Sequence, residues 1–162
     1  MKTIVCRIDR CLACRSCELA CVVAHSKSGN LADAMREPER PAPRVRVRAA
    51  DKKGDGVRPR SKAVQCRQCA NAACIEACGV SGAIRRDEVT GVIMIDPEQC
   101  TGCWACELAC PHGAILRSKD GRYAIVCDRC GDRDVPACVE ACLAEALVLK
   151  GTDSKGPSGR KQ

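Results

Sequence analysis

Short strand-forming runs, rather than long periodic stretches, make up the apolar part of this chain. They occur at residues 3–8, 83–86, 92–95, 115–117, 123–126 and 147–149. The polar sequences DEVTG and SKDG join the four central runs into two pairs, and such turn-like spacers predict two β-hairpins. The runs at 3–8 and 147–149 stand alone near the two ends.

A cysteine-containing segment is repeated four times between these runs. Each copy begins Ala/Ser-Cys-x-x-x-Cys, with a short helix-like stretch between the two cysteines. The copies are SCELACVVAHS (16–26), ACIEACGVSGAI (73–84), ACELACPHGAIL (105–116) and ACVEACLAEALVL (137–149). We therefore expect a small α+β protein with short strands, short helices and long loops.

Residues 27–65 interrupt the repeat with a basic, proline-rich stretch, which carries eleven Lys and Arg against five Asp and Glu. Within it Arg44, Arg46 and Arg48 alternate with apolar residues, so one face of a strand would be all arginine. This pattern fits an edge strand protected by charge, a docking face for an acidic partner, or an anion or nucleic-acid site. The polar tail at 151–162 is predicted to be disordered.

Large apolar side chains are too few to build an ordinary core. The 162 residues include no Phe, and Trp104 and Tyr123 are the only aromatic residues, whereas cysteine occurs 17 times. A disulfide scaffold would require an oxidising compartment. The sequence shows neither a signal-peptide pattern nor an apolar run of membrane-spanning length. We therefore expect a soluble cytoplasmic protein without a membrane span, whose reduced thiols bind metal.

Sixteen of the cysteines fall into four groups of four. These are Cys11, Cys14, Cys17, Cys21; Cys66, Cys69, Cys74, Cys78; Cys100, Cys103, Cys106, Cys110; and Cys127, Cys130, Cys138, Cys142. The first and third groups read C-x2-C-x2-C-x3-C, and Pro111 follows the third. This is the bacterial ferredoxin spacing for a [4Fe–4S] cluster, in which the fourth cysteine ligates the other cluster of a pair. Four groups predict four clusters and a protein that carries electrons.

Zinc is the alternative metal, because the second and fourth groups have spacings that zinc tolerates. However, zinc favours two separated C-x2-C pairs, and the first and third groups instead have three closely spaced cysteines. Cys6 is predicted to be a buried inert thiol, with ligand replacement or redox sensing as alternatives. Trp104 is expected to pack at a cluster edge, and His25 and His112 to form hydrogen bonds rather than to ligate metal.

The formal charge of +7 does not by itself indicate nucleic-acid binding. Each [4Fe–4S] cluster with four thiolates adds a charge of about −2, so four clusters would offset the basic excess. Aromatic side chains that could stack on bases are also missing. The sequence contains no phosphate-binding loop and no paired nucleophile and base, so we expect no catalytic site.

These residues resemble the four-cluster ferredoxin-like electron-transfer subunits of redox enzymes. That group includes the iron–sulfur subunits of dimethyl-sulfoxide-reductase-type molybdoenzymes and the ferredoxins of hydrogenases and formate hydrogenlyase. It also includes the ferredoxin partner of nickel carbon monoxide dehydrogenase and the small subunit of tungsten aldehyde oxidoreductases. The opening CLACRSCELAC (11–21), followed by AHS (24–26), looks most like these last two types. The resemblance covers about residues 3–150 and implies two interleaved bacterial-ferredoxin-like two-cluster lobes.

The resemblance implies how the cysteines are shared. Residues 1–26 plus 127–150 would form one lobe, and 66–126 the other, with 27–65 as a basic insert and 151–162 as a flexible tail. The four ligand sets would be Cys11, Cys14, Cys17 with Cys142; Cys127, Cys130, Cys138 with Cys21; Cys66, Cys69, Cys74 with Cys110; and Cys100, Cys103, Cys106 with Cys78. Val22, Gly79 and Leu143 stand where the family has proline, which affects local turns and potentials.

The implied function is to relay single electrons between a catalytic oxidoreductase subunit and an acceptor subunit. The catalytic partner would be a tungsten, molybdenum or nickel enzyme, and filaments of alternating subunits are compatible with such a relay. The alternatives are a free soluble polyferredoxin and, more remotely, a zinc-binding structural or nucleic-acid protein. The basic stretch favours the subunit, with Arg44, Arg46 and Arg48 as the docking residues.

Overall fold

Four separate two-stranded antiparallel sheets form the framework of the chain. The computed structural model describes residues 3–49, 61–79, 81–131 and 133–150. The sheets pair β1 (Thr3–Cys6) with β8 (Leu147–Lys150), β2 (Val45–Ala49) with β3 (Ser61–Gln65), β4 (Ile84–Arg86) with β5 (Ile93–Ile95), and β6 (Leu116–Arg117) with β7 (Ala124–Ile125). The helices are α1 (Ser16–Ala24), α2 (Leu31–Ala34), α3 (Ala73–Ala77), α4 (Ala105–Ala109) and α5 (Ala137–Glu140).

The two predicted hairpins, β4–β5 and β6–β7, are confirmed, as is the α+β character with short elements and no closed sheet. The two isolated runs near the chain ends pair with each other as β1 and β8, in a register that sets Thr3 opposite Lys150. Each central strand is a residue or two shorter than its apolar run. The predicted tail at 151–162 lies outside the described residues.

Residues 27–65 contribute more to the fold than their composition suggests. Besides the expected strand, now β2, they supply its partner β3 and the helix α2, whose N-cap Asn30 accepts a hydrogen bond from the Asp33 N–H at 3.0 Å. Val45 on β2 is 1% exposed and Ala63 on β3 is 6% exposed. The described part of the basic stretch is therefore anchored in the core through Val45 and Ala63.

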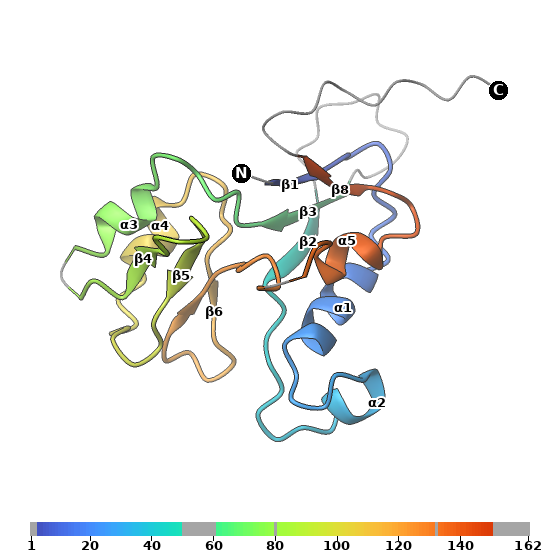
Figure 1. Cartoon of the computed structure of the whole chain (residues 1–162), viewed down its shortest axis with the longest axis horizontal. Coiled ribbons are helices and arrows are strands. Elements are labelled where there is room, and N and C mark those ends of the chain that lie inside the picture. The colour runs from blue at the N-terminus through green and yellow to red at the C-terminus, as the bar shows by residue number, and fades with distance from the viewer. Residues whose placement is uncertain (1–2, 50–60, 80, 132, 151–162) are drawn as a thin grey trace.

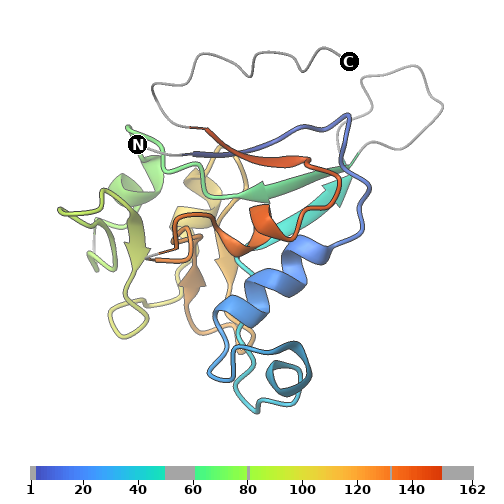
Figure 2. The same ribbon diagram turned by 45° about the vertical axis from the view of Figure 1, so that its right-hand side comes forward.

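The elements gather on two sides of the molecule (Figure 1). On one side lie β1, β8, α1 and α5, which we call the terminal side, and α1 packs on α5. On the other side lie α3, α4 and the strands β4 to β7, the central side, where α3 packs on α4. Figure 2 shows β3 alongside β1 and β8, so the β2–β3 hairpin belongs with the terminal side. Helices distant in sequence are thus brought together in pairs.

The core contains thiols where another protein would have aromatic rings. Its buried cluster combines small and branched aliphatic side chains with seven cysteines, namely Cys17, Cys21, Cys66, Cys74, Cys106, Cys127 and Cys138. The largest side chains that are fully buried are Ile93 and Val45. The thiols therefore face the interior between the short elements, as the scarcity of large apolar residues predicts.

Candidate metal centres

The backbone of the cysteine loops follows one pattern in all four groups. The residue just before the second cysteine of each group has left-handed φ, at 56° for Ala13, 55° for Gln68, 67° for Gly102 and 60° for Arg129. This conformation costs a residue with a Cβ about 1–2 kcal/mol. Successive N–H groups in such a turn face one side and form a concave site for an anion. The loops are therefore built to surround a negatively charged group.

The packing of α1 on α5 shares cysteines between the first and fourth groups. Burial raises the pKa of Cys17 to about 12, and the charges of Cys14 and Cys142 add to the effect. Burial also raises the pKa of Cys138, followed by the charges of Cys127, Cys21 and Cys130. Cys142 therefore lies near the first group, and Cys21 lies near the fourth.

The packing of α3 on α4 shares cysteines in the same way on the central side. Burial raises the pKa of Cys66 to about 11, and the neighbouring thiols that add to this are Cys74, Cys69 and Cys110. Burial likewise raises the pKa of Cys106 to about 11, with contributions from Cys100, Cys78 and Cys103. Cys110 therefore lies near the second group, and Cys78 lies near the third.

These neighbourhoods are compatible with the four ligand sets that the sequence resemblance implies, which we call quartets A to D. They are A (Cys11, Cys14, Cys17, Cys142), B (Cys21, Cys127, Cys130, Cys138), C (Cys66, Cys69, Cys74, Cys110) and D (Cys78, Cys100, Cys103, Cys106). Cys11 and Cys142 both act on the pKa of Cys6, so they too lie close together. In each quartet, two helices remote in sequence meet.

Several cysteine sulfur atoms in or next to the helices accept a hydrogen bond from a backbone N–H group. Backbone N–H groups donate to Cys21 from Arg44 at 3.2 Å, to Cys110 from Ala114 at 3.4 Å and to Cys142 from Leu147 at 3.4 Å. In the loops, the N–H of Gln68 donates to Cys66 at 3.4 Å. Such donors stabilise thiolate ligands and influence the electronic properties of the metal.

The donor set fits iron–sulfur clusters. Buried thiols with raised pKa values stay protonated alone, but they become thiolates when they bind metal. Four thiolates are the ligand set of a [4Fe–4S] cluster, so the residue type and number of the donors in each group fit such a cluster. Among residues 3–49, 61–79, 81–131 and 133–150, no three His, Cys, Asp or Glu side chains form a group that could hold a metal ion.

The quartets differ in exposure, and thiols of B lie near thiols of both A and C. The pKa of Cys138 responds to Cys17, which places quartet B next to A, and the pKa of Cys127 responds to Cys66, which places B next to C. Cys14 in A and Cys103 in D are the two exposed cysteines of the chain. The order A, B, C, D therefore has buried or half-buried thiols in the middle and one exposed thiol at each end.

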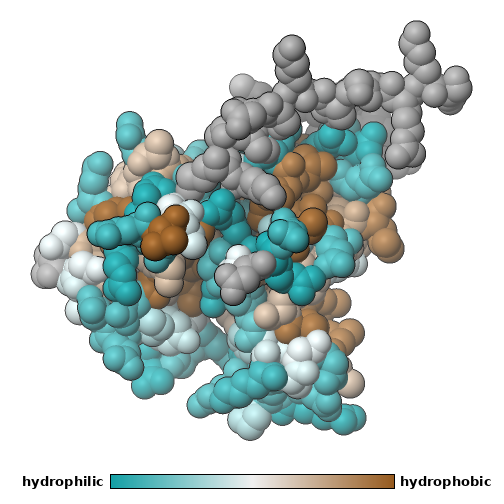
Figure 3. All heavy atoms as spheres, viewed as in Figure 1, coloured by the Kyte–Doolittle hydropathy of each residue, from teal (hydrophilic) through white to brown (hydrophobic). Residues whose placement is uncertain are grey.

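Exposed leucines accompany the two exposed cysteines. Leu12 precedes Cys14 by two residues and is 75% exposed, Leu143 follows the last cysteine of quartet A and is 96% exposed, and Leu108 near quartet D is 88% exposed. On the face drawn in Figure 3, hydrophobic side chains lie in separate patches among hydrophilic ones. The accessible thiols thus have apolar neighbours that a partner could cover.

A charged network lies beside Cys21. The His25 Nδ1 is 2.7 Å from the Cys21 carbonyl oxygen, and its Nε2 is 3.0 Å from the Asp128 carboxylate, which raises the pKa of His25 to about 10. Burial of Asp128 opposes its ionisation, but the His25 hydrogen bond and the Arg44 charge outweigh burial and lower its pKa to about 2. Arg44 forms an ion pair with Asp128. Two cations and one carboxylate therefore adjoin quartet B.

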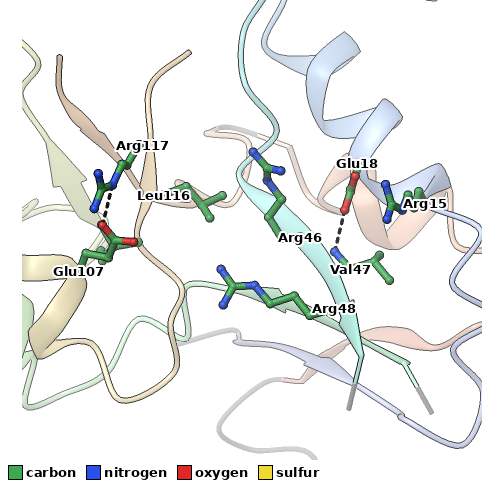
Figure 4. Close-up of a pocket in the computed structure, with 9 residues that line it drawn as sticks. Arg15, Glu18, Arg46, Val47, Arg48, Glu107, Leu116 and Arg117 are labelled. Atoms are coloured by element: carbon green, nitrogen blue, oxygen red, sulfur yellow. Dashed lines mark hydrogen bonds and ion pairs between the residues drawn. The ribbon is translucent and has the colours of Figure 1, made fainter. Parts of the chain in front are cut away.

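Arg44, Arg46 and Arg48, which alternate in the sequence, have different surroundings in the structure. Arg44 points to Asp128, whereas Arg46 and Arg48 are exposed and line a pocket with Arg15 and Arg117 (Figure 4). Two equivalent glutamates of the repeat also line it. Glu18 accepts a hydrogen bond from the Val47 N–H at 2.7 Å, and Glu107 accepts one from Arg117 Nε at 2.9 Å. We call this the arginine pocket.

Three further residues singled out in the sequence have the following surroundings. Cys6 is half-buried rather than fully buried as predicted. Its sulfur accepts a hydrogen bond from the Ala63 N–H at 3.3 Å, and burial raises its pKa. Trp104 is the N-cap residue that precedes α4 and has left-handed φ, and the Arg117 guanidinium lies 4.3 Å from its ring centre. His112 is half-buried, and burial together with the Arg67 charge lowers its pKa.

Sequence reasoning missed Asp128 and Gln68. Asp128 directly follows Cys127, so its position gave a signal, but its partners come from the distant residues 25 and 44. Gln68 is 4% exposed and forms hydrogen bonds with both ends of its amide. Its position in the loop matches that of Ala13, Gly102 and Arg129, and a comparison of the four loops would have identified it.

Comparisons with known proteins agree on one family for this chain. Residues 60–152 match the family described as 4Fe-4S dicluster domain. The chain is 37% identical over 161 residues to the electron transport protein HydN of Escherichia coli K12, covering 90% of this chain and 85% of HydN. It is 36% identical over 164 residues to an iron–sulfur protein of Rhodospirillum rubrum, covering 90% and 80%. A ferredoxin of Methanocaldococcus jannaschii is 35% identical over 150 residues, covering 91% and 79%.

Among solved structures, the chain resembles one in the active site complex BamBC of benzoyl coenzyme A reductase. The TM-score is 0.48 and the identity 24%, covering 99% of this chain and 82% of that one. No helix in the described part of the chain has both the length and the apolar character needed to span a bilayer. The chain belongs to the 4Fe-4S dicluster-domain family, the ferredoxin-like electron-transfer proteins.

Proposed function

We propose that quartets A to D each hold one [4Fe–4S] cluster and that the chain relays single electrons along the order A, B, C, D. When bound, such clusters supply one-electron oxidation and reduction. The observation that supports the proposal is the packing of α1 on α5 and of α3 on α4, which brings thiols of different sequence groups close enough to raise one another's pKa. The protein's part is to supply thiolates, to donate hydrogen bonds to them and to bury quartets B and C.

The relay connects a catalytic oxidoreductase subunit to a separate acceptor. An exposed thiol at each end, Cys14 in A and Cys103 in D, supports two exits to different proteins. A catalytic partner with a tungsten, molybdenum or nickel centre that oxidises an aldehyde or carbon monoxide fits the sequence resemblance. The chain itself acts as a carrier and not as the site of substrate turnover. A free polyferredoxin is the second candidate, favoured by relatives named simply as ferredoxin.

The arginine pocket is the proposed docking face for an acidic surface of the partner. Arg46 and Arg48 are exposed there beside Arg15, and its glutamates are already engaged by Val47 and Arg117. Arg44 differs from the other two because it pairs with Asp128. Complementary charge across an interface mainly raises the association rate and is screened by salt.

Metal analysis of the anaerobically purified protein tests the cofactor content. Four cubanes require about sixteen iron and sixteen sulfide per chain. About twelve iron with bound zinc would reduce the number of clusters to three. Mixing the protein with a candidate partner, with reduction followed in the visible spectrum, then tests the relay. Turnover of an aldehyde or of carbon monoxide by this chain alone would refute the carrier role.

Charge reversal tests the docking face. Arg46→Glu with Arg48→Glu should slow complex formation at low salt and leave the iron content unchanged. The matched control is Arg36→Glu with Lys119→Glu, which reverses two exposed charges elsewhere on the chain. Equal association rates for the two double variants would show that the arginine pocket is only a charged edge.

A further inference from the structure

Quartets B and C meet at a single buried glutamine. Gln68 lies in the loop between Cys66 and Cys69 and is 4% exposed. Its Nε2 donates to the Cys127 carbonyl oxygen at 2.6 Å, and its Oε1 accepts from the Ile93 N–H at 2.6 Å. One side-chain amide therefore ties the cysteine loop of quartet C to the cysteine loop of quartet B and to strand β5.

We propose that Gln68 is a positioning residue that fixes the distance between the metal centres of quartets B and C. This inference rests on the proposed function, because it assigns Gln68 to the step where an electron passes between the terminal and central sides. The Cys127 thiol is close enough to Cys66 to be affected by its charge. The contact between the loops is thus also the contact between the two quartets.

The backbone of Gln68 serves the same purpose as its side chain. Its φ of 55° turns the loop, and its N–H donates to the Cys66 sulfur at 3.4 Å. The same residue therefore contacts a ligand sulfur of C through its backbone and the main chain of a ligand of B through its side chain. A shift of Gln68 would move the ligands of the two quartets relative to each other.

Comparison of the four equivalent loops supports this role. At the position before the second cysteine, the loops of quartets B and C carry long polar side chains, Arg129 and Gln68. Arg129 reaches the Thr90 carbonyl oxygen at 3.4 Å, in the turn of the same β4–β5 hairpin that Gln68 contacts. The loops of quartets A and D carry Ala13, with a single methyl group, and Gly102, without a side chain. At this position, side chains that reach a neighbouring segment thus belong to the two inner loops.

Two buried glutamines provide a matched comparison. Gln65 is also 4% exposed and directly precedes Cys66, and its Nε2 donates to the Ile4 carbonyl oxygen at 2.9 Å, so its contact joins β3 to β1 and not the two inner loops. Gln68→Met and Gln65→Met each replace an amide by an apolar side chain of similar length. Gln68→Met removes two buried hydrogen bonds and with them the connection between B and C, whereas Gln65→Met removes one buried hydrogen bond and leaves that connection in place.

The experiment measures the magnetic interaction between reduced clusters in the holoprotein by electron paramagnetic resonance. Iron and sulfide content are measured alongside. Wild type should show interacting spins, and Gln68→Met should lose part of the B–C interaction while keeping its iron. The rate at which electrons equilibrate within the chain after a reducing pulse should fall in the same variant. Gln65→Met should leave both properties unchanged.

A second variant tests the inference if Gln68→Met does not assemble its clusters. Gln68→Glu keeps the acceptor for the Ile93 N–H but places a carboxylate oxygen against the Cys127 carbonyl oxygen, which breaks the connection between B and C. This variant should therefore also weaken the spin interaction. The spin interaction depends on the distance between the clusters and not on the added charge. Unchanged spin interaction in an iron-replete Gln68 variant would overturn the inference, as would an equal loss in Gln65→Met. Fewer than four clusters in wild type would instead overturn the proposed function.

Discussion

Asp128 is the residue whose charge we expect to contribute most to stability outside the thiols. It accepts hydrogen bonds from His25 at 3.0 Å and from the Cys130 N–H at 3.0 Å, and it pairs with Arg44. Its side chain is 29% exposed. Asp128→Asn keeps the shape of the side chain but removes its charge. The cations His25 and Arg44 then lose their anionic partner, and one of the hydrogen-bond donors faces an amide NH₂ group.

The pKa of Asp128 gives the size of the effect. The value falls from 3.8 to about 2 because the His25 and Arg44 interactions outweigh burial. Each pKa unit corresponds to about 1.4 kcal/mol, so the charged form is stabilised by roughly 2.5 kcal/mol. In a chain of 162 residues, each kcal/mol lowers the unfolding temperature by about 2–4 °C. Asp128→Asn should therefore unfold roughly 5–10 °C lower than wild type.

Loss of visible absorption on heating, at one scan rate and at pH 7 under anaerobic conditions, measures this difference. A fixed scan rate is needed because unfolding with cofactor loss is irreversible. The matched control is Asp134→Asn, an exposed aspartate in the segment between Cys130 and Cys138. An Asp128→Asn shift no larger than that of the control would contradict the assigned network.

Two further pairs of variants test the ligand assignment of Cys142 and the backbone constraint at Gly102. Cys142→Ser should remove iron from quartet A, although its other ligands lie more than a hundred residues earlier in the chain, whereas Cys6→Ser should retain the full iron content. Loss of iron from quartet B in the Cys142 variant would show that each sequence group binds metal locally. Gly121→Ala, with φ of +70° and open space around the new Cβ, should cost only the roughly 1–2 kcal/mol of left-handed backbone. Gly102→Ala should lower the unfolding temperature further, since its Cβ would lie 2.8 Å from the Arg122 carbonyl oxygen, and equal effects would refute that clash.

The sequence by itself determined the chemistry and the small units of this protein. Cysteine spacing depends on how one loop wraps one group, and that is local, so it predicts iron–sulfur binding directly. Hairpins such as β4–β5 join neighbouring runs through a few turn residues. The near-absence of aromatic residues also indicates an interior filled by thiols, as the buried Cys17, Cys74 and Cys138 show.

The tertiary structure decided which distant residues meet. The pairing of β1 with β8 and of α1 with α5 brings Cys142 close to Cys17, and the local cysteine spacing cannot predict such a contact. The arginine alternation predicted one continuous face, but Asp128 lies within reach of Arg44 alone and leaves Arg46 and Arg48 in the arginine pocket. In the sequence, nothing distinguishes Gln68 from other loop residues, and only folding places its side chain between the Cys127 carbonyl oxygen and the Ile93 N–H. A buried polar group takes its role from partners that only the folded chain brings close.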